Sequence, residues 1–96
     1  MVEGSLTEPV RRRVVVHGLV HGVGFRASCA RRARALGLAG SVRNCFDGTV
    51  EAVFEGNDGS VAEMIEWCRN GPPLARVSAV EVSDEPARRQ RGFSIT

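Results

Sequence analysis

Lysine and tyrosine are both absent from this 96-residue sequence, and the remaining aromatic residues are one tryptophan and four phenylalanines. Without a lysine, the chain has no P-loop lysine, no Schiff-base lysine and no lysine nucleophile. All 13 basic residues are arginines, so arginine is the only strong permanent cation that can hold an anion. Against 11 acidic residues they leave a net charge of +2, a surplus too small to indicate nucleic-acid binding by itself.

Residues that ligate metals are also scarce. The three cysteines, Cys29, Cys45 and Cys68, form no C-x-x-C pair, and their odd number does not suit a disulfide framework. A zinc site would need ligands from distant segments, because His17 and His21 are the only imidazoles. We expect reduced, structural thiols, no metal and no cofactor.

Long apolar runs are missing as well. No uncharged apolar run exceeds a few residues, and residues 1–9 have no apolar core of the secretory type. The sequence therefore predicts a soluble, cytoplasmic protein that contacts no membrane. Its length, with 43% hydrophobic and 25% charged residues, suits one small core. We expect a flexible tail over residues 1–9, a single domain over residues 10–96, and a monomer.

Hydrophobic periodicity predicts the first four elements of this domain. β-branched residues predict a strand over residues 10–17, and apolar residues at helical spacing predict a helix from Phe25 to Gly37. Alternation on both sides of Asp47 and Gly48 predicts a β-hairpin. These two residues are expected to take the positive φ values of a tight turn.

The second half of the chain adds a helix and two strands. Ser60 and Glu63 have the spacing of a capping box at the start of a helix, which Gly71 and two prolines end. Residues 77–82 predict a strand, residues 83–90 a charged loop, and residues 92–96 a short closing strand.

The order of elements is β-α-β-β-α-β with an extra terminal strand. It predicts an α+β fold, a ferredoxin-like two-layer α/β sandwich in which two helices cover one face of an antiparallel sheet. That architecture hosts enzymes, metal carriers and RNA-binding domains, so the fold alone does not decide the function.

A glycine-rich segment, Gly18-Leu-Val-His-Gly-Val-Gly-Phe-Arg26, connects the first strand to the first helix. Its backbone N–H groups can converge on one point, where the helix N-terminus adds partial positive charge. The helix dipole disfavours Arg26 in the first turn, yet its guanidinium can close over a phosphate there. The segment fits an anion cradle, and it fits equally a plain glycine turn followed by a solvated arginine.

Two ordered motifs resemble the signatures of the acylphosphatase family. The first is Gly-x-Val-x-Gly-Val-x-Phe-Arg over residues 18–26, and the second is Asn-x-x-Asp-Gly-x-Val-Glu, which starts at Asn44. Residues 71–77 and the terminal Phe-x-Ile also fit, so the resemblance covers roughly residues 10–96. His21 stands where the family commonly has glutamine, and Ser41 where it commonly has an aromatic residue.

The resemblance implies metal-independent hydrolysis of the carboxyl–phosphate bond of small acyl phosphates, which yields a carboxylate and inorganic phosphate. It implies that Asn44 holds the attacking water in line with the leaving carboxylate. It also implies that Arg26 binds the phosphoryl oxygens together with backbone N–H groups of His21, Gly22, Val23, Gly24 and Phe25. Phosphoryl transfer asks mainly for positioning and charge stabilisation, which these groups can supply.

Three other functions remain open on the sequence. An RNA-recognition domain shares the element order, but it displays aromatic residues where this chain has Glu51, Val53 and Glu55. We therefore expect no nucleic-acid partner. A carbamoyl-phosphate-handling module, similar to the amino-terminal domain of hydrogenase-maturation carbamoyltransferases, is the second. A non-enzymatic anion-binding module is the third, and the joint presence of Arg26 and Asn44 argues against it.

Overall fold

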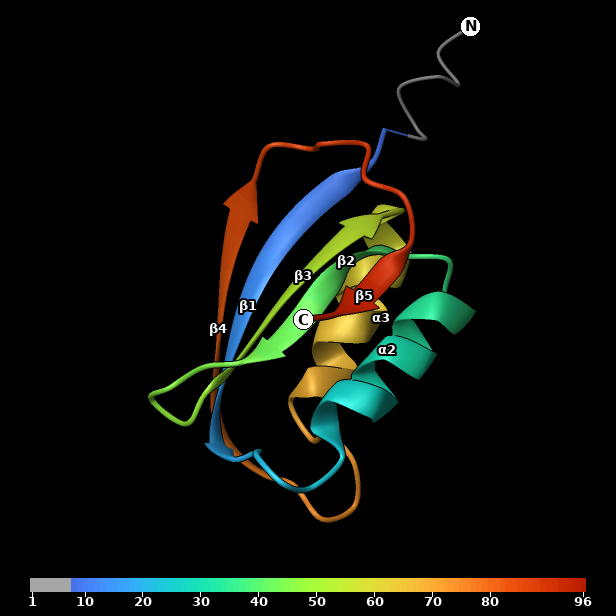
Figure 1. Cartoon of the computed structure of the whole chain (residues 1–96). Helices are drawn as coiled ribbons and strands as arrows, with labels where there is room; N and C mark the ends of the chain where they lie inside the picture. The colour runs from blue at the N-terminus through green and yellow to red at the C-terminus, as the bar shows by residue number, and fades with distance from the viewer. Residues whose placement is uncertain (1–7) are drawn as a thin grey trace, which may run out of the picture.

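The computed structural model describes residues 8–96, in which five strands and two helices follow one another along the chain (Figure 1). Most of the tail expected over residues 1–9 lies outside the described residues. The elements are β1 (Val10–Leu19), α2 (Phe25–Ala35), β2 (Ala39–Asn44), β3 (Val50–Gly56), α3 (Asp58–Cys68), β4 (Arg76–Glu85) and β5 (Phe93–Ile95).

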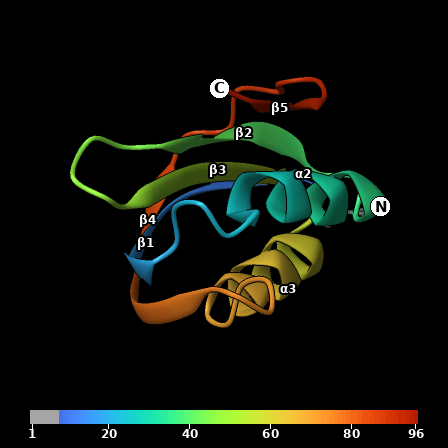
Figure 2. The same ribbon diagram turned by 60° about the horizontal axis from the view of Figure 1, so that its bottom comes forward.

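The strands form one sheet in the order β4-β1-β3-β2-β5, and both helices lie on the same face of it (Figure 2). The predicted ferredoxin-like two-layer α+β sandwich is confirmed. One feature of the prediction is wrong, because β5 pairs in parallel with β2 and the sheet is mixed. The chain leaves β4 at the end of the sheet where β2 begins, so the closing strand must run in the same direction as β2 (Figure 1).

The core lies between the sheet and the two helices. Alternation in β3 turns Val50, Ala52 and Phe54 toward the helices, and all three are at most 1% exposed. The helices cover them with residues at a spacing of three or four: Phe25, Cys29, Ala30 and Ala33 from α2, and Val61, Met64, Ile65 and Cys68 from α3. At 11 residues each, these helices are too short and too polar to span a membrane, and residues 8–96 contain no other helix.

The cysteines agree with the expected structural role. All three are free thiols, with Cys29 and Cys68 buried between the helices and the sheet and Cys45 half-buried. A hydrogen bond with Cys68, together with burial, raises the pKa of the Cys29 thiol far above its ordinary value. The Cys29 thiol therefore stays neutral and packs in the core.

The loop between β2 and β3 is longer than the predicted two-residue turn. The backbone N–H of Cys45 donates to the Thr49 carbonyl (2.9 Å), and the N–H of Gly48 donates to the Cys45 carbonyl (3.1 Å). Gly48 has a φ of 92°, but Asp47 does not share a positive φ. The Asp47 carboxylate instead accepts hydrogen bonds from the backbone N–H (3.1 Å) and hydroxyl (2.7 Å) of Thr49. These bonds select a three-residue loop with glycine in the left-handed position.

Helix α3 begins before the predicted capping box. The side chain of Asn57 accepts hydrogen bonds from the backbone N–H groups of Gly59 (2.9 Å) and Ser60 (3.3 Å), so Asn57 is the N-cap. Asp58 adds a carboxylate in the first turn, where the helix dipole favours negative charge. The predicted start at Ser60 is wrong, because Asn57 already accepts the hydrogen bonds of the first N–H groups and Asp58 lies in the first turn.

Strand β4 extends three residues further than predicted. Residues 83–85 were expected in a charged loop, but they continue the antiparallel ladder with β1. Each terminal acid meets an arginine there: Asp84 lies 3.0 Å from Nε of Arg12, and Glu85 lies 3.0 Å from Nε of Arg11. The charges that suggested a loop are therefore cross-strand partners.

A buried ion pair fixes the connection from β4 to β5. Arg11 is 5% exposed and Glu55 is 3% exposed, with Nη1 and Oε1 2.9 Å apart. Gln90 accepts a second bond from Arg11 (3.0 Å), and the backbone N–H groups of Arg88 and Arg89 donate to Glu55 (2.9 and 2.7 Å). Burial alone would raise the pKa of Glu55, but these hydrogen bonds outweigh it and hold the pKa below its ordinary value.

Candidate active site

The glycine-rich segment ends in an open helix N-terminus. Gly22 and Gly24 have φ values of 72° and 78°, in the left-handed region that glycine adopts without strain. Gly24 is the N-cap of α2, with no side chain capping the helix and no acidic residue in the first turn. The first helical hydrogen bond runs from Ser28 N–H to the Gly24 carbonyl (3.1 Å). The N–H groups before Ser28 are therefore free to bind an anion.

Arg26 and Asn44 line one cavity of about 250 Å³ at this helix end. Arg26 comes from the first turn of α2, whereas Asn44 is the last residue of β2, paired with Val50. Arg26 takes part in none of the ion pairs found among residues 8–96, so its charge is available. A guanidinium, a carboxamide and free backbone N–H groups thus border one space, which suits a phosphoryl group and a water molecule.

His21 ties the loop to the β2–β3 hairpin. Its Nε2 lies 2.8 Å from the backbone carbonyl oxygen of Thr49. Because that oxygen can only accept, Nε2 carries the proton and donates. A glutamine amide at this position can make the same bond, so the departure from the family pattern keeps the link between loop and hairpin. His21 also lines a neighbouring cavity of about 340 Å³, which shares Asn44 with the first.

The residues singled out in the sequence divide into three groups. Gly22, Gly24, Phe25 and Arg26 line the 250 Å³ cavity together with Asn44. His21 lines the neighbouring cavity only. Val23 lines neither cavity, and its half-buried side chain packs against the core.

Three lining residues were not expected from the sequence, namely Val20, Ala27 and Ile95. Ile95 is the most distant of them in the sequence, and β5 delivers it to the site. Parallel pairing sets Ile95 opposite Val42, two residues before Asn44. The terminal Phe-x-Ile pattern was a signal for this residue, although its position beside the site depends on the parallel register.

Among residues 8–96, no carboxylate lines the cavity. The nearby Asp47 and Glu51 are engaged in the hairpin. Hydrogen bonds from Thr49 lower the pKa of Asp47. Burial would raise the pKa of Glu51, but bonds from Arg43 and Arg13 outweigh it and lower the pKa. Over residues 8–96, no three His, Cys, Asp or Glu side chains are grouped so that they could hold a metal ion. The chemistry available in the cavity is charge stabilisation and positioning.

Comparison with known proteins identifies the family. A family model described as Acylphosphatase matches residues 12–95. The chain belongs to the acylphosphatase family. An acylphosphatase of Rubrobacter xylanophilus is 53% identical over 92 residues, which are 95% of this chain and 84% of that protein. The structure of an acylphosphatase from Coxiella burnetii has a TM-score of 0.89 and 35% identity, with 93% of this chain and 94% of that chain covered.

A longer protein contains a similar module. The crystal structure of Thermococcus kodakarensis HypF aligns with 91% of this chain but with only 12% of its own, at a TM-score of 0.80 and 32% identity. The Coxiella acylphosphatase is matched over 94% of its chain, whereas HypF is matched over only 12%. The comparisons therefore favour acylphosphatases and give no support to the carbamoyl-phosphate-handling alternative.

Proposed function

We propose that this acylphosphatase-family enzyme hydrolyses small acyl phosphates in the cavity between the N-terminus of α2 and the end of β2. Family membership supports acyl phosphate hydrolysis as the reaction. The observation that carries the location is the shared lining of Arg26 and Asn44, which lie 18 residues apart in the sequence on a helix and a strand.

In this proposal Arg26 and Asn44 have different roles. Arg26 donates charge-assisted hydrogen bonds to the phosphoryl oxygens, assisted by backbone N–H groups of His21, Gly22, Val23, Gly24 and Phe25. The side-chain amide of Asn44 orients the attacking water in line with the leaving carboxylate. The support for these roles is the open helix N-terminus on one side of the cavity and the carboxamide on the other.

The reaction then needs no side-chain base. The water oxygen forms a bond to phosphorus while the bond from phosphorus to the carboxyl oxygen breaks, and the leaving carboxylate takes the electron pair. In the absence of a carboxylate in the cavity lining, a non-bridging phosphoryl oxygen accepts the water proton. Arg26 and the N–H groups stabilise the negative charge on the phosphoryl group in the loose transition state.

The expected partners and location follow the same proposal. The enzyme acts as a monomer in the cytoplasm and binds no nucleic acid. A net charge of +2, and the row of Glu51, Val53 and Glu55 on the helix-free face of β3, support the last point. Free thiols at all three cysteines are typical of a reducing compartment. Size-exclusion chromatography with light scattering tests the monomer.

Steady-state hydrolysis of benzoyl phosphate in the presence of EDTA tests the proposed function. We expect saturable release of benzoate and inorganic phosphate at the same rate with and without the chelator. A folded protein that releases no phosphate would contradict the enzyme assignment. Activity that EDTA abolishes and Mg²⁺ restores would contradict the metal-independent mechanism.

A further inference from the structure

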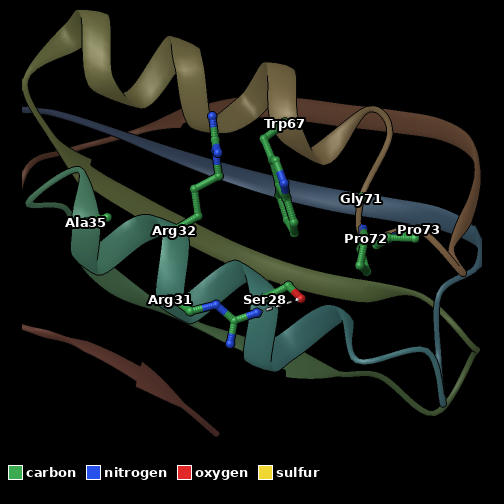
Figure 3. Close-up of a pocket in the computed structure, with 8 residues that line it drawn as sticks. All are labelled: Ser28, Arg31, Arg32, Ala35, Trp67, Gly71, Pro72 and Pro73. Atoms are coloured by element: carbon green, nitrogen blue, oxygen red, sulfur yellow. Dashed lines mark hydrogen bonds between the residues drawn. The ribbon is translucent and has the colours of Figure 1, made fainter.

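A third cavity, of about 380 Å³, opens between the two helices on the outer side of the helical layer (Figure 3). Trp67 extends from α3 toward α2, and Arg32 extends from α2 toward α3 (Figure 3). Arg31 lies beside Ser28, which accepts a hydrogen bond from its Nη2 (3.4 Å). The cavity shares no lining residue with the proposed active site.

One wall of the cavity is apolar. The half-buried ring of Trp67 packs on Phe25, with ring centroids 5.3 Å apart. Glycine at position 71 leaves room for this ring pair, because a Cβ there would come within 2.9 Å of the Phe25 ring. Pro72 and Pro73 continue the wall after the end of α3. A rigid indole beside two prolines offers a surface on which a planar ring can stack.

The opposite wall is cationic. Arg31 and Arg32 line the cavity, and no acidic residue of the described part of the chain does. Arg31 forms no ion pair with any residue from 8 to 96, and Arg32 has only a 3.6 Å contact with the exposed Glu63. The two guanidinium groups point to different sides, Arg32 toward α3 and Arg31 toward Ser28 (Figure 3). Both side chains are long and exposed, so both can turn toward a phosphate dianion in the cavity, which accepts bidentate hydrogen bonds.

This cavity is separate from the proposed active site. Arg26 and Ser28 are two residues apart in α2, which sets their side chains about 200° apart around the helix axis. Arg26 therefore faces the cavity that contains Asn44, whereas Ser28 faces α3. The two cavities therefore open on different sides of α2.

We propose that the cavity between α2 and α3 is a binding site for a nucleoside monophosphate. The base stacks on Trp67 and the prolines, and the side chains of Arg31 and Arg32 turn toward the phosphate. A volume of about 380 Å³ is within the usual range for small-molecule sites. The proposal is independent of the hydrolytic reaction, since it uses none of its residues.

Trp67 makes the binding test direct. It is the only tryptophan and the chain has no tyrosine, so the intrinsic fluorescence comes from this cavity. We expect adenosine monophosphate to quench Trp67 fluorescence saturably, with isothermal titration calorimetry giving the same Kd. Adenosine and inorganic phosphate, each lacking one half of the ligand, should bind at least about tenfold more weakly.

Matched arginine variants identify the site. Arg31→Ala should weaken adenosine monophosphate binding about tenfold, while Arg91→Ala, which removes the same charge from the exposed connection to β5, should leave the Kd within about twofold. Arg26→Gln should also leave the Kd unchanged, because Arg26 faces the other cavity. Glu63→Gln should tighten binding, since it frees Arg32 from its only ion pair among the described residues.

Four results would overturn the proposal. They are the absence of adenosine monophosphate binding up to about 10 mM, equal affinity for adenosine, an unchanged Kd in Arg31→Ala, and loss of binding in Arg26→Gln. The last result would place the nucleotide in the proposed active site.

Discussion

At the scale of single residues, the proposed mechanism depends on the charge of Arg26. Arg26→Gln keeps a hydrogen-bond donor, on a side chain two atoms shorter, but removes the positive charge from the anion cradle. We expect kcat/KM for benzoyl phosphate to fall about 10²–10³-fold, because a preorganised charge on the phosphoryl oxygens is lost. Circular dichroism should remain native, because the Arg26 side chain is half-exposed and outside the core. A natively folded variant with more than about a tenth of wild-type kcat/KM would contradict this role.

Asn44→Ala separates water positioning from phosphate binding. The amide is proposed to hold the water and not the anion, so kcat should fall about 10²-fold or more while the inhibition constant of inorganic phosphate changes little. Initial-rate kinetics with phosphate as a competitive inhibitor measure both quantities. If phosphate affinity falls as far as in Arg26→Gln, Asn44 belongs to the anion site and the water role is wrong.

At the scale of elements, the N-cap of α3 is testable with two neighbouring residues. Asn57→Ala removes the acceptor of two backbone N–H groups, and we expect the free energy of unfolding to fall by about 1 kcal/mol. Ser60→Ala is the matched control, since Ser60 lies within the helix and should change stability by about 0.5 kcal/mol or less. Urea unfolding gives both values. A larger loss in Ser60→Ala than in Asn57→Ala would restore the capping-box interpretation.

The buried ion pair between β1 and β3 predicts how the fold responds to acid. The pKa of Glu55 lies below its ordinary value of 4.5, so its ionised form stabilises the native state above that pH. This contribution is lost as the pH falls through the lowered pKa, because the native state must then take up a proton. Glu55→Gln removes the titration, and its free energy of unfolding should fall less steeply than that of the wild type below pH 4.5.

Urea unfolding between neutral pH and the acid limb measures this difference. Glu51 and Asp47 also have lowered pKa values, so the variant keeps part of the acid dependence. The control is Glu63→Gln, because Glu63 is exposed and has only a 3.6 Å contact with Arg32. Parallel pH profiles for wild type and Glu55→Gln would contradict a stabilising role for the ionised pair.

The elements also show where sequence patterns are sufficient and where they are not. Alternation in β3 and helical spacing in α2 depend on neighbours a few residues away, and both elements were predicted nearly to the residue. The direction of β5 and the position of Ile95 depend on pairing with β2, about 50 residues earlier in the chain. The length of β4 depends on Arg11 and Arg12 opposite it, so its local charges were misleading.

In the candidate site, too, some features could be predicted from the sequence and others could not. Arg26 and Asn44 could be predicted because they fall in two family motifs with a fixed spacing. The bond from His21 to the Thr49 carbonyl could not be predicted, because a backbone acceptor leaves no mark on the sequence. The cavity beside Trp67 could not be predicted from the residue types either, since it forms only when α2 and α3 pack side by side.

At the scale of the whole molecule, the anion cradle of residues 18–26 should link phosphate binding to stability. A site that exists only in the folded state stabilises it by about 2.7 kcal/mol when inorganic phosphate is at about 100 times its Kd. For a domain of this size, we expect Tm to rise by about 10 °C. Differential scanning calorimetry in phosphate and in chloride at matched ionic strength measures the specific part.

Arg26→Gln is the control for general salt effects. Exclusion of phosphate from the protein surface stabilises any variant, whereas phosphate binding at the anion cradle should largely disappear when the guanidinium is removed. An equal rise in Tm for wild type and Arg26→Gln would contradict the anion cradle and would make residues 18–26 a simple glycine turn.

The position of β5 has a consequence for synthesis on the ribosome. Ile95 borders the same cavity as Gly22 and Asn44. The wall of the proposed active site is therefore completed by a residue that is translated some 70 residues after the glycine-rich segment. A nascent chain that has released α2, α3 and the first four strands can form most of the core but still lacks this wall. The enzyme should therefore begin turnover only after residues 93–95 have left the exit tunnel, and stalled chains of increasing length should gain activity abruptly at that point.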